Sequence, residues 1–186
     1  MFELPPMPTW DSLHPLIIHF PIALLFLSPI FIGISAALAP PKGRPFLIAA
    51  LIVLVLGTAS LFIAASTGKA AGELAERGGP VDSVLASHED LASETKLIFS
   101  GLSAMLIGIF ILPRLLRRQE TRIFSTVLPL AYLVLYSVGI LFLVNASHQG
   151  GRLVHEYGVH AIPLATRSQP EPTPIAAAST KEDNRN

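Results

Sequence analysis

The chain carries six histidines, and all of them lie at or just outside the same end of four apolar segments. They are His14, His19, His88, His148, His155 and His160. Imidazole nitrogen binds haem iron, zinc and copper, and a histidine at membrane depth is costly enough to be a candidate functional residue. His19 lies about 7 Å into the first segment at 1.5 Å per residue. The pattern predicts a metal or cofactor site at one end of a small membrane bundle.

Composition indicates an integral membrane protein. Of 186 residues, 51% are hydrophobic and 14% are charged, whereas soluble proteins average about 25% charged residues. The apolar residues gather into stretches at roughly 15–39, 46–66, 97–112 and 123–146. A spanning helix needs about 20 apolar residues, so the third qualifies only if its helix begins earlier. Val84 to Leu116 can form one helix of about 33 residues, roughly 50 Å long.

We therefore expect an all-α bundle of four transmembrane helices. An interfacial lead-in occupies residues 1–13, the transmembrane domain 14–163 and a tail 164–186. The tail is rich in Pro, Ala, Ser and Thr with mixed charge, which predicts disorder. No basic residue precedes the first stretch, so we expect a retained span rather than a secretory signal.

The distribution of charge predicts the orientation. Four spans place both termini on one side, here called side A, and the loops 40–45 and 113–122 on the other, side B. The side B loops carry six of the 13 basic residues: Lys42, Arg44, Arg114, Arg117, Arg118 and Arg122. Because cytoplasmic loops concentrate Lys and Arg, side B is predicted to be cytoplasmic and both termini exoplasmic. In a bacterium, the chain would cross the inner membrane with its histidines toward the periplasm.

Several classes of chemistry are disfavoured. The chain has no cysteine, which excludes disulfides, iron–sulfur clusters, c-type haem attachment and thiolate metal sites. The formal net charge is zero and no basic patch with interleaved aromatics occurs, so we expect no nucleic-acid partner. No nucleophile–base arrangement or phosphate loop is visible, and we assign no catalytic residue.

Two prolines lie within the first span. Pro21 and Pro29 each lack an N–H, which leaves the carbonyl of Ile17 or Leu25 without its helical donor. We expect a bend there, and Pro21 could shape the turn that holds His19.

Glycines suggest where helices meet or end. Gly57, Ala64, Gly68 and Gly72 form a smooth stripe, which favours close helix packing over the seating of a flat cofactor. The pair Gly150-Gly151 is predicted to break the fourth helix.

Three readings of the histidines remain open. Two histidines on facing helices at matched depth suit one b-type haem, held by two of His19, His88 and His148, with His14 and an acidic rim around it. Three converging histidines (His19, His88 and His148) would instead suit zinc or copper. The rings could also only hold helices together through hydrogen bonds. Because no histidine lies near side B, at most one haem fits. His155 and His160 are expected at the interface or in solvent.

The order of the motifs resembles a known family. His14-Pro15, then His19-Phe20-Pro21-Ile22, His88 heading the third helix, and His148-x-Gly150-Gly151-x-Leu153-Val154 are similar to the bacterial Domain of Unknown Function 2231. The resemblance covers roughly residues 11–160 and matches His14, His19, His88 and His148 to the family's histidines. His155 stands where the family often has Tyr.

Members of this family occur alone or fused to Rieske or cytochrome c modules, so the resemblance implies a redox setting. We therefore expect a membrane subunit for respiratory or other electron transfer, with the lipid bilayer as its surroundings and cytochrome c or Rieske proteins as redox partners. The alternative is a non-catalytic membrane subunit that binds zinc or copper.

Overall fold

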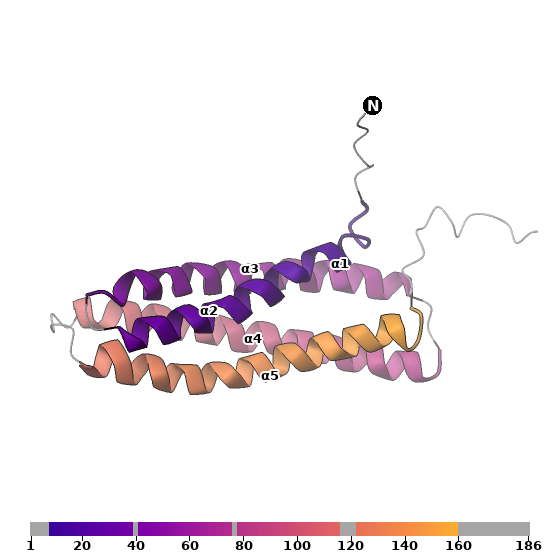
Figure 1. The fold of residues 1–186 in the computed structure, drawn as a ribbon. Coiled ribbons are helices and arrows are strands. Elements are labelled where there is room, and N and C mark those ends of the chain that lie inside the picture. Colours follow the sequence, from indigo (N-terminus) through magenta and orange to yellow (C-terminus); the bar gives the residue numbers. More distant parts are fainter. Residues whose placement is uncertain (1–7, 39–40, 76–77, 116–121, 160–186) are drawn as a thin grey trace, which may run out of the picture.

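The computed structural model describes residues 8–38, 41–75, 78–115 and 122–159. Their backbone forms an elongated helical bundle (Figure 1). Four helices are long and apolar enough to cross a membrane: His14–Ala37, Arg44–Leu74, Pro80–Pro113 and Ile123–His155. The predicted all-α, four-span architecture is therefore confirmed. The sequence-predicted tail and His160 lie outside the described residues.

The first and last spans each consist of two helical pieces. In chain order the elements are α1 (His14–Ile17), α2 (His19–Ala37), α3 (Arg44–Leu74), α4 (Pro80–Leu115), the π-helix η1 (Ile123–Val127) and α5 (Leu128–His155). α2 packs mainly against α3, and α4 packs mainly against α5. The start of α1 and the end of α5 lie at the same end of the bundle (Figure 1), which is side A.

Proline helps to begin several helices. Pro15, Pro45 and Pro129 occupy the first turns of α1, α3 and α5, and α4 begins at Pro80. At the starts of α1, α3 and α4 the missing N–H costs nothing, because the first N–H groups of a helix have no intrahelical acceptor. Pro129 differs, because the π-helix η1 runs directly into α5. α4 is one helix of 36 residues, which is about 54 Å at 1.5 Å per residue. The third span thus begins before its apolar stretch, as predicted.

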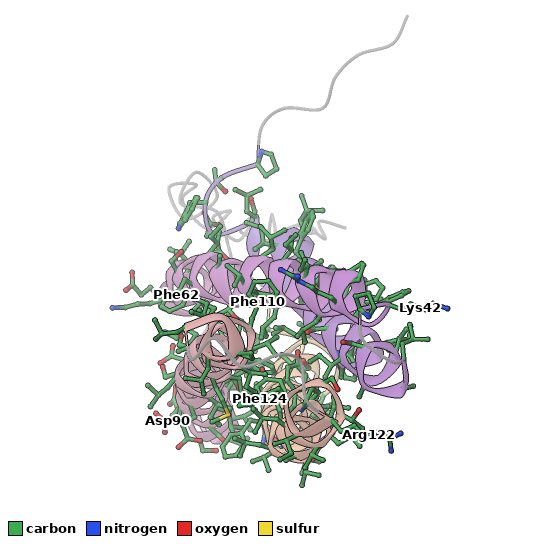
Figure 2. All side chains as sticks on the ribbon, turned by 90° about the vertical axis from the view of Figure 1, so that its left-hand side faces the viewer. Lys42, Phe62, Asp90, Phe110, Arg122 and Phe124 are labelled. Carbon is green, nitrogen blue, oxygen red and sulfur yellow. The ribbon has the colours of Figure 1, made fainter. Side chains whose placement is uncertain are left out.

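The bundle is apolar on both its inside and its outside. Leu25, Leu54 and Phe99 are fully buried in the core, whereas Val134 and Leu141 are 72% and 61% exposed. Large apolar side chains on the outer surface of long helices fit a lipid environment. Lys42 and Arg122 project outward at the side B end (Figure 2).

The two membrane prolines act differently. The first span divides into α1 and α2 at Ile18, three residues before Pro21, but the backbone of Ile18 keeps helical dihedral angles (φ −59°, ψ −25°). Pro29 lies inside α2 without interrupting it. The carbonyl of Leu25, which Pro29 cannot serve, accepts a hydrogen bond of 2.7 Å from the hydroxyl of Tyr136 on α5.

The prediction that Gly150-Gly151 breaks the fourth helix is wrong. α5 continues through both glycines to His155. The reason is tertiary packing. Gly150 lies against the His88 ring, and Leu153 is buried one turn later with Val84 and Leu85 of α4.

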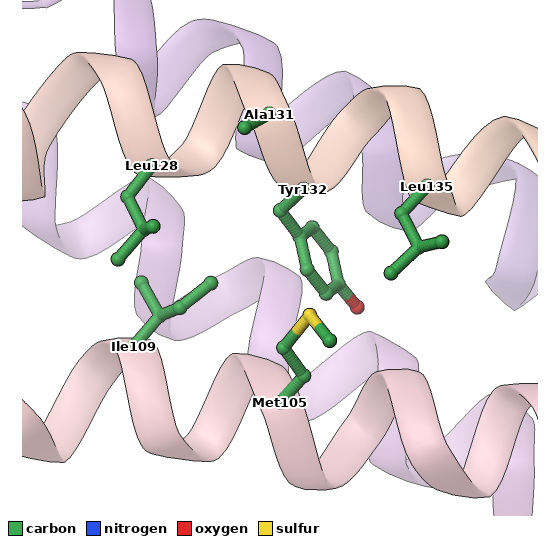
Figure 3. A pocket seen from close by; sticks show the side chains of 6 residues that line it. All are labelled: Met105, Ile109, Leu128, Ala131, Tyr132 and Leu135. Atoms are coloured by element: carbon green, nitrogen blue, oxygen red, sulfur yellow. The ribbon is translucent and has the colours of Figure 1, made fainter.

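A small apolar hollow lies far from the histidines. It has a volume of about 190 Å³ and lies between α4 and the early turns of α5 (Figure 3). It is lined by Met105, Ile109, Leu128, Ala131, Tyr132 and Leu135. No titratable carboxylate or imidazole lines it, so it is not the predicted site.

Candidate functional site

His14 is held against α3. Its Nδ1 lies 3.1 Å from the hydroxyl oxygen of Thr67, which is itself fully buried. The Thr67 oxygen also lies 3.1 Å from the Ile63 carbonyl and 3.0 Å from the Ala64 carbonyl. Carbonyls only accept, so the hydroxyl can donate its one proton to either of them and leave its oxygen free to accept from His14. The Thr67 oxygen is then the acceptor for an N–H at Nδ1 of His14.

His88 is held against α5. Its Nδ1 lies 2.8 Å from the backbone carbonyl of Ala146. That carbonyl has no proton to give, so Nδ1 of His88 must be the donor. Ala146 is buried near the side A end of α5, and His88 itself is part-buried. Thr95 and Phe99 follow His88 at helical spacing, and their side chains are 1% and 0% exposed, so this face of α4 points inward.

Both rings are thus in the same chemical state. In a neutral imidazole with its proton on Nδ1, the lone pair lies on Nε2. A donated Nδ1–H is also the usual way in which proteins orient a histidine that binds a metal through its other nitrogen. His14 and His88 are therefore both prepared to act as ligands through Nε2.

The structure brings these two histidines together. His14 rests on Gly68 of α3, and Glu89, the residue after His88, lies against Gly72 one turn further along the same helix. His14 belongs to the part of the bundle built from α1, α2 and α3, and His88 to the part built from α4 and α5. A ligand shared by both rings would connect the two parts.

Each ring rests on a glycine of the neighbouring helix. A Cβ added to Gly68 would lie 2.8 Å from Cε1 of His14. A Cβ added to Gly150 would lie 3.0 Å from Cε1 of His88. Gly68 belongs to the small-residue stripe, where Gly57 packs against Leu25 in the same manner. The stripe is thus used for close packing, as predicted, and at Gly68 the packed side chain is a histidine.

The other predicted ligands face outward. His19 is exposed beside Phe20, which is 59% exposed. Five residues turn a helix by about 140°, so with His14 directed at α3 the ring of His19 is turned away. On α5, Ala146 and Gly150 face α4, and His148 between them is exposed. His155 is exposed as well.

No three of these residues converge. Within residues 8–38, 41–75, 78–115 and 122–159, no group of three or more His, Cys, Asp or Glu side chains is placed to hold a metal ion. The set of His19, His88 and His148 is not brought together there. The pair that does come together includes His14, which the sequence placed at the periphery of the site.

Acidic residues flank both histidines in the sequence. Glu89 follows His88, and its Oε1 would lie 3.2 Å from a Cβ at Gly72 of α3. Asp11 lies three residues before His14, and its Oδ2 is buried without a hydrogen-bond partner among the described residues. Asp90 points outward from α4 (Figure 2).

The site lies at the membrane surface rather than at its centre. His88 lies about 12 Å along α4 before Lys96, at 1.5 Å per residue, and the apolar stretch begins only after Lys96. Its partner Ala146 is the last residue of the apolar stretch in α5. Sequence reasoning missed Thr67 and Ala146, because which residues oppose a histidine depends on the register between helices.

The geometry agrees with the family indicated by the motifs. The family described as "Predicted membrane protein (DUF2231)" matches residues 11–163. That range contains all four spans, both paired histidines and the two glycines on which they rest. No curated protein and no solved structure matches the chain. The chain belongs to the DUF2231 family of predicted membrane proteins.

Proposed function

We propose that this chain is a membrane subunit that binds one b-type haem at its side A end through Nε2 of His14 and His88, and that it serves electron transfer. One observation carries the proposal: two histidines from different helices, both near the side A end, each have Nδ1 in a hydrogen bond to a neighbouring helix. Their Nε2 lone pairs remain available as ligands. Bundles commonly hold cofactors between side chains of facing helices.

The number of ligands favours haem over zinc. A b-type haem takes two axial ligands, which is the number that His14 and His88 supply. Zinc sites use three or four protein ligands, and the described residues hold no such group. Bound haem would supply one-electron redox chemistry. The chain's own contribution is to fix the position and orientation of both rings through Thr67 and the Ala146 carbonyl.

The charge distribution extends the proposal to location and partners. With the basic loops on the cytoplasmic side, side A faces the periplasm of a bacterial inner membrane. A haem at the membrane surface is within reach of soluble or membrane-anchored redox partners. Cytochrome c or Rieske proteins are the partners that the family's fusions suggest. Exposed acidic residues such as Asp82, Glu89 and Asp90 on α4 would favour a basic partner.

A second candidate rests on the same hydrogen bonds. The contacts of His14 with Thr67 and of His88 with the Ala146 carbonyl hold α1 on α3 and α4 on α5 without any ligand. The histidines would then only hold helices together, or would bind zinc or copper with ligands from residues outside the described ranges.

The first experiment is a dithionite-reduced minus oxidised visible spectrum of the protein purified from haem-replete cells, with iron, zinc and copper measured on the same sample. Sharp α and Soret bands with stoichiometric iron support the haem proposal. A flat spectrum in a preparation supplemented with haem during purification contradicts it, and stoichiometric zinc or copper would favour the second candidate.

Asparagine variants separate ligation from structural support. The amide nitrogen of Asn can take the place of Nδ1, so His88→Asn keeps a donor for the Ala146 carbonyl and removes Nε2. Under the haem proposal, His88→Asn and His14→Asn fold normally and lose the haem bands. The matched controls are His148→Asn and His19→Asn, whose rings are exposed and whose loss should leave the bands unchanged. Haem retained in both His14→Asn and His88→Asn would exclude this ligand pair.

A further inference from the structure

The segment that carries His14 is a separate piece of the first span. α1 has four residues, and none of them is fully buried. α1 and α2 meet at Ile18, whose backbone keeps helical dihedral angles (φ −59°, ψ −25°). Helices this short are not stable by themselves, so contacts with the rest of the protein must hold α1 in place.

The junction between α1 and α2 is weakened by its sequence. Pro21 has no N–H for the carbonyl of Ile17, and a proline disfavours the helical conformation of the residue before it. Across this junction, the N–H of Ile18 lies 3.1 Å from the His14 carbonyl, and the N–H of Ile22 lies 3.4 Å from the Ile18 carbonyl. The second of these is long for a helical hydrogen bond. Ile18 is therefore the position at which the segment can pivot.

Besides the backbone packing of α1 on α3 and α2, the side chain that attaches the segment to α3 by a hydrogen bond is His14. It donates to Thr67 and fills the space above Gly68, where even a methyl group would collide with it. The lead-in before α1 adds local hydrogen bonds, such as that from the Ser12 hydroxyl to the Thr9 carbonyl. Those bonds keep the segment's shape but do not attach it to α3.

From this geometry we infer that residues 8–17 form a strap that pivots at Ile18, and that the His14 ring is the clasp that closes it on α3. In the closed position His14 lies beside His88, and in the open position the pair is separated. The clasp itself does not depend on the proposed function. The ligand behind the strap does depend on the proposed function: if haem binds this pair, the haem can enter and leave only when the strap opens.

Distance measurement between spin labels tests the strap without any haem. The chain has no cysteine, so labels can be placed at Ser12→Cys and Lys69→Cys, two exposed positions on the strap and on α3. We expect a short main distance in the full-length protein. Thr67→Val removes the acceptor and keeps the shape, and Gly68→Ala displaces the ring. Both should shift the population toward longer distances.

Two controls make the result decisive. Gly101→Ala adds a methyl group where no atom lies within 4 Å, and it should leave the distances unchanged. A second label pair at Lys69→Cys and Glu94→Cys, both exposed on α3 and α4, reports whether the bundle itself is intact. Unchanged Ser12–Lys69 distances in both Thr67→Val and Gly68→Ala, with an intact bundle, would overturn the strap. This outcome is independent of whether haem binds.

Discussion

The hydroxyl of Tyr136 donates a 2.7 Å hydrogen bond to the carbonyl of Leu25, more than one hundred positions away in the chain. That carbonyl lacks a helical donor because Pro29 stands where the N–H should be. Tyr136 is 1% exposed, and its ring also meets Phe99 edge to face with centroids 5.4 Å apart. Tyr136 of α5 thus supplies the hydrogen-bond donor that Pro29 removes from α2, and its ring packs against α4.

Removing this hydroxyl should destabilise the bundle. Tyr136→Phe keeps the ring and leaves the Leu25 carbonyl buried without a donor, which costs about 1–2 kcal/mol. Tyr132→Phe is the matched control, because its hydroxyl donates to the Leu102 carbonyl in an uninterrupted helix. That carbonyl keeps its helical donor, so the loss should be nearer the ~0.6 kcal/mol typical between membrane helices. Reversible unfolding in mixed micelles measures both.

The proline can be tested directly. Pro29→Ala restores an N–H for the Leu25 carbonyl, and in that background Tyr136→Phe should cost clearly less than in the natural chain. An equal cost in both backgrounds would show that the hydrogen bond does not compensate for the proline.

Two adjacent glycines should respond in opposite ways to the same substitution. A Cβ at Gly150 would lie 3.0 Å from the His88 ring, whereas nothing lies within 4 Å of one at Gly151. Both positions are inside α5. Gly151→Ala should stabilise the protein by up to about 1 kcal/mol through helix propensity. Gly150→Ala should lose that gain, because the His88 ring must shift by a few tenths of an ångström and its hydrogen bond to the Ala146 carbonyl is then strained.

Thermal unfolding in detergent distinguishes the two variants, and a haem spectrum adds a second readout. Only Gly150→Ala should change the haem bands under the proposed function. If both alanines raise the melting temperature equally, His88 does not rest on Gly150 as described.

The spans are well predicted because the property that determines them, a long apolar stretch, can be read directly from the sequence. Apolar stretches determine the four helices, and the charged start of the third span does not prevent α4 from beginning at Pro80. The freed Leu25 carbonyl also follows from Pro29 alone. Its partner Tyr136 does not, because helix register decides which residue lies opposite.

The same limit explains the site. The sequence identifies His88 and its inward face, and it marks Gly68 as part of a packing stripe. It cannot show that His14 occupies the space above Gly68, nor that α5 continues past Gly150 and turns His148 outward. Both depend on contacts between distant segments, which override the local tendency of glycine to end a helix.

The hydrogen bonds also predict the tautomers of the two histidines. His14 and His88 should carry their proton on Nδ1 at a pH where both rings are neutral. Nitrogen-15 NMR of histidine-labelled, haem-free protein reads this from the ring nitrogen shifts. His14→Asn and His88→Asn assign the two signals. A proton on Nε2 of His88 would contradict its bond to the Ala146 carbonyl, because that carbonyl can only accept.

The orientation in the membrane can be settled with single cysteines. Lys42 lies at the side B end and Asp82 lies in the first turn of α4 at the side A end, and both are exposed. An impermeant maleimide should label Asp82→Cys and not Lys42→Cys in right-side-out vesicles, and the reverse in inverted vesicles, because basic loops stay in the cytoplasm. Ser83→Cys is a second reporter for side A. The opposite labelling pattern would turn the histidine pair toward the cytoplasm, and periplasmic redox proteins could then no longer be its partners.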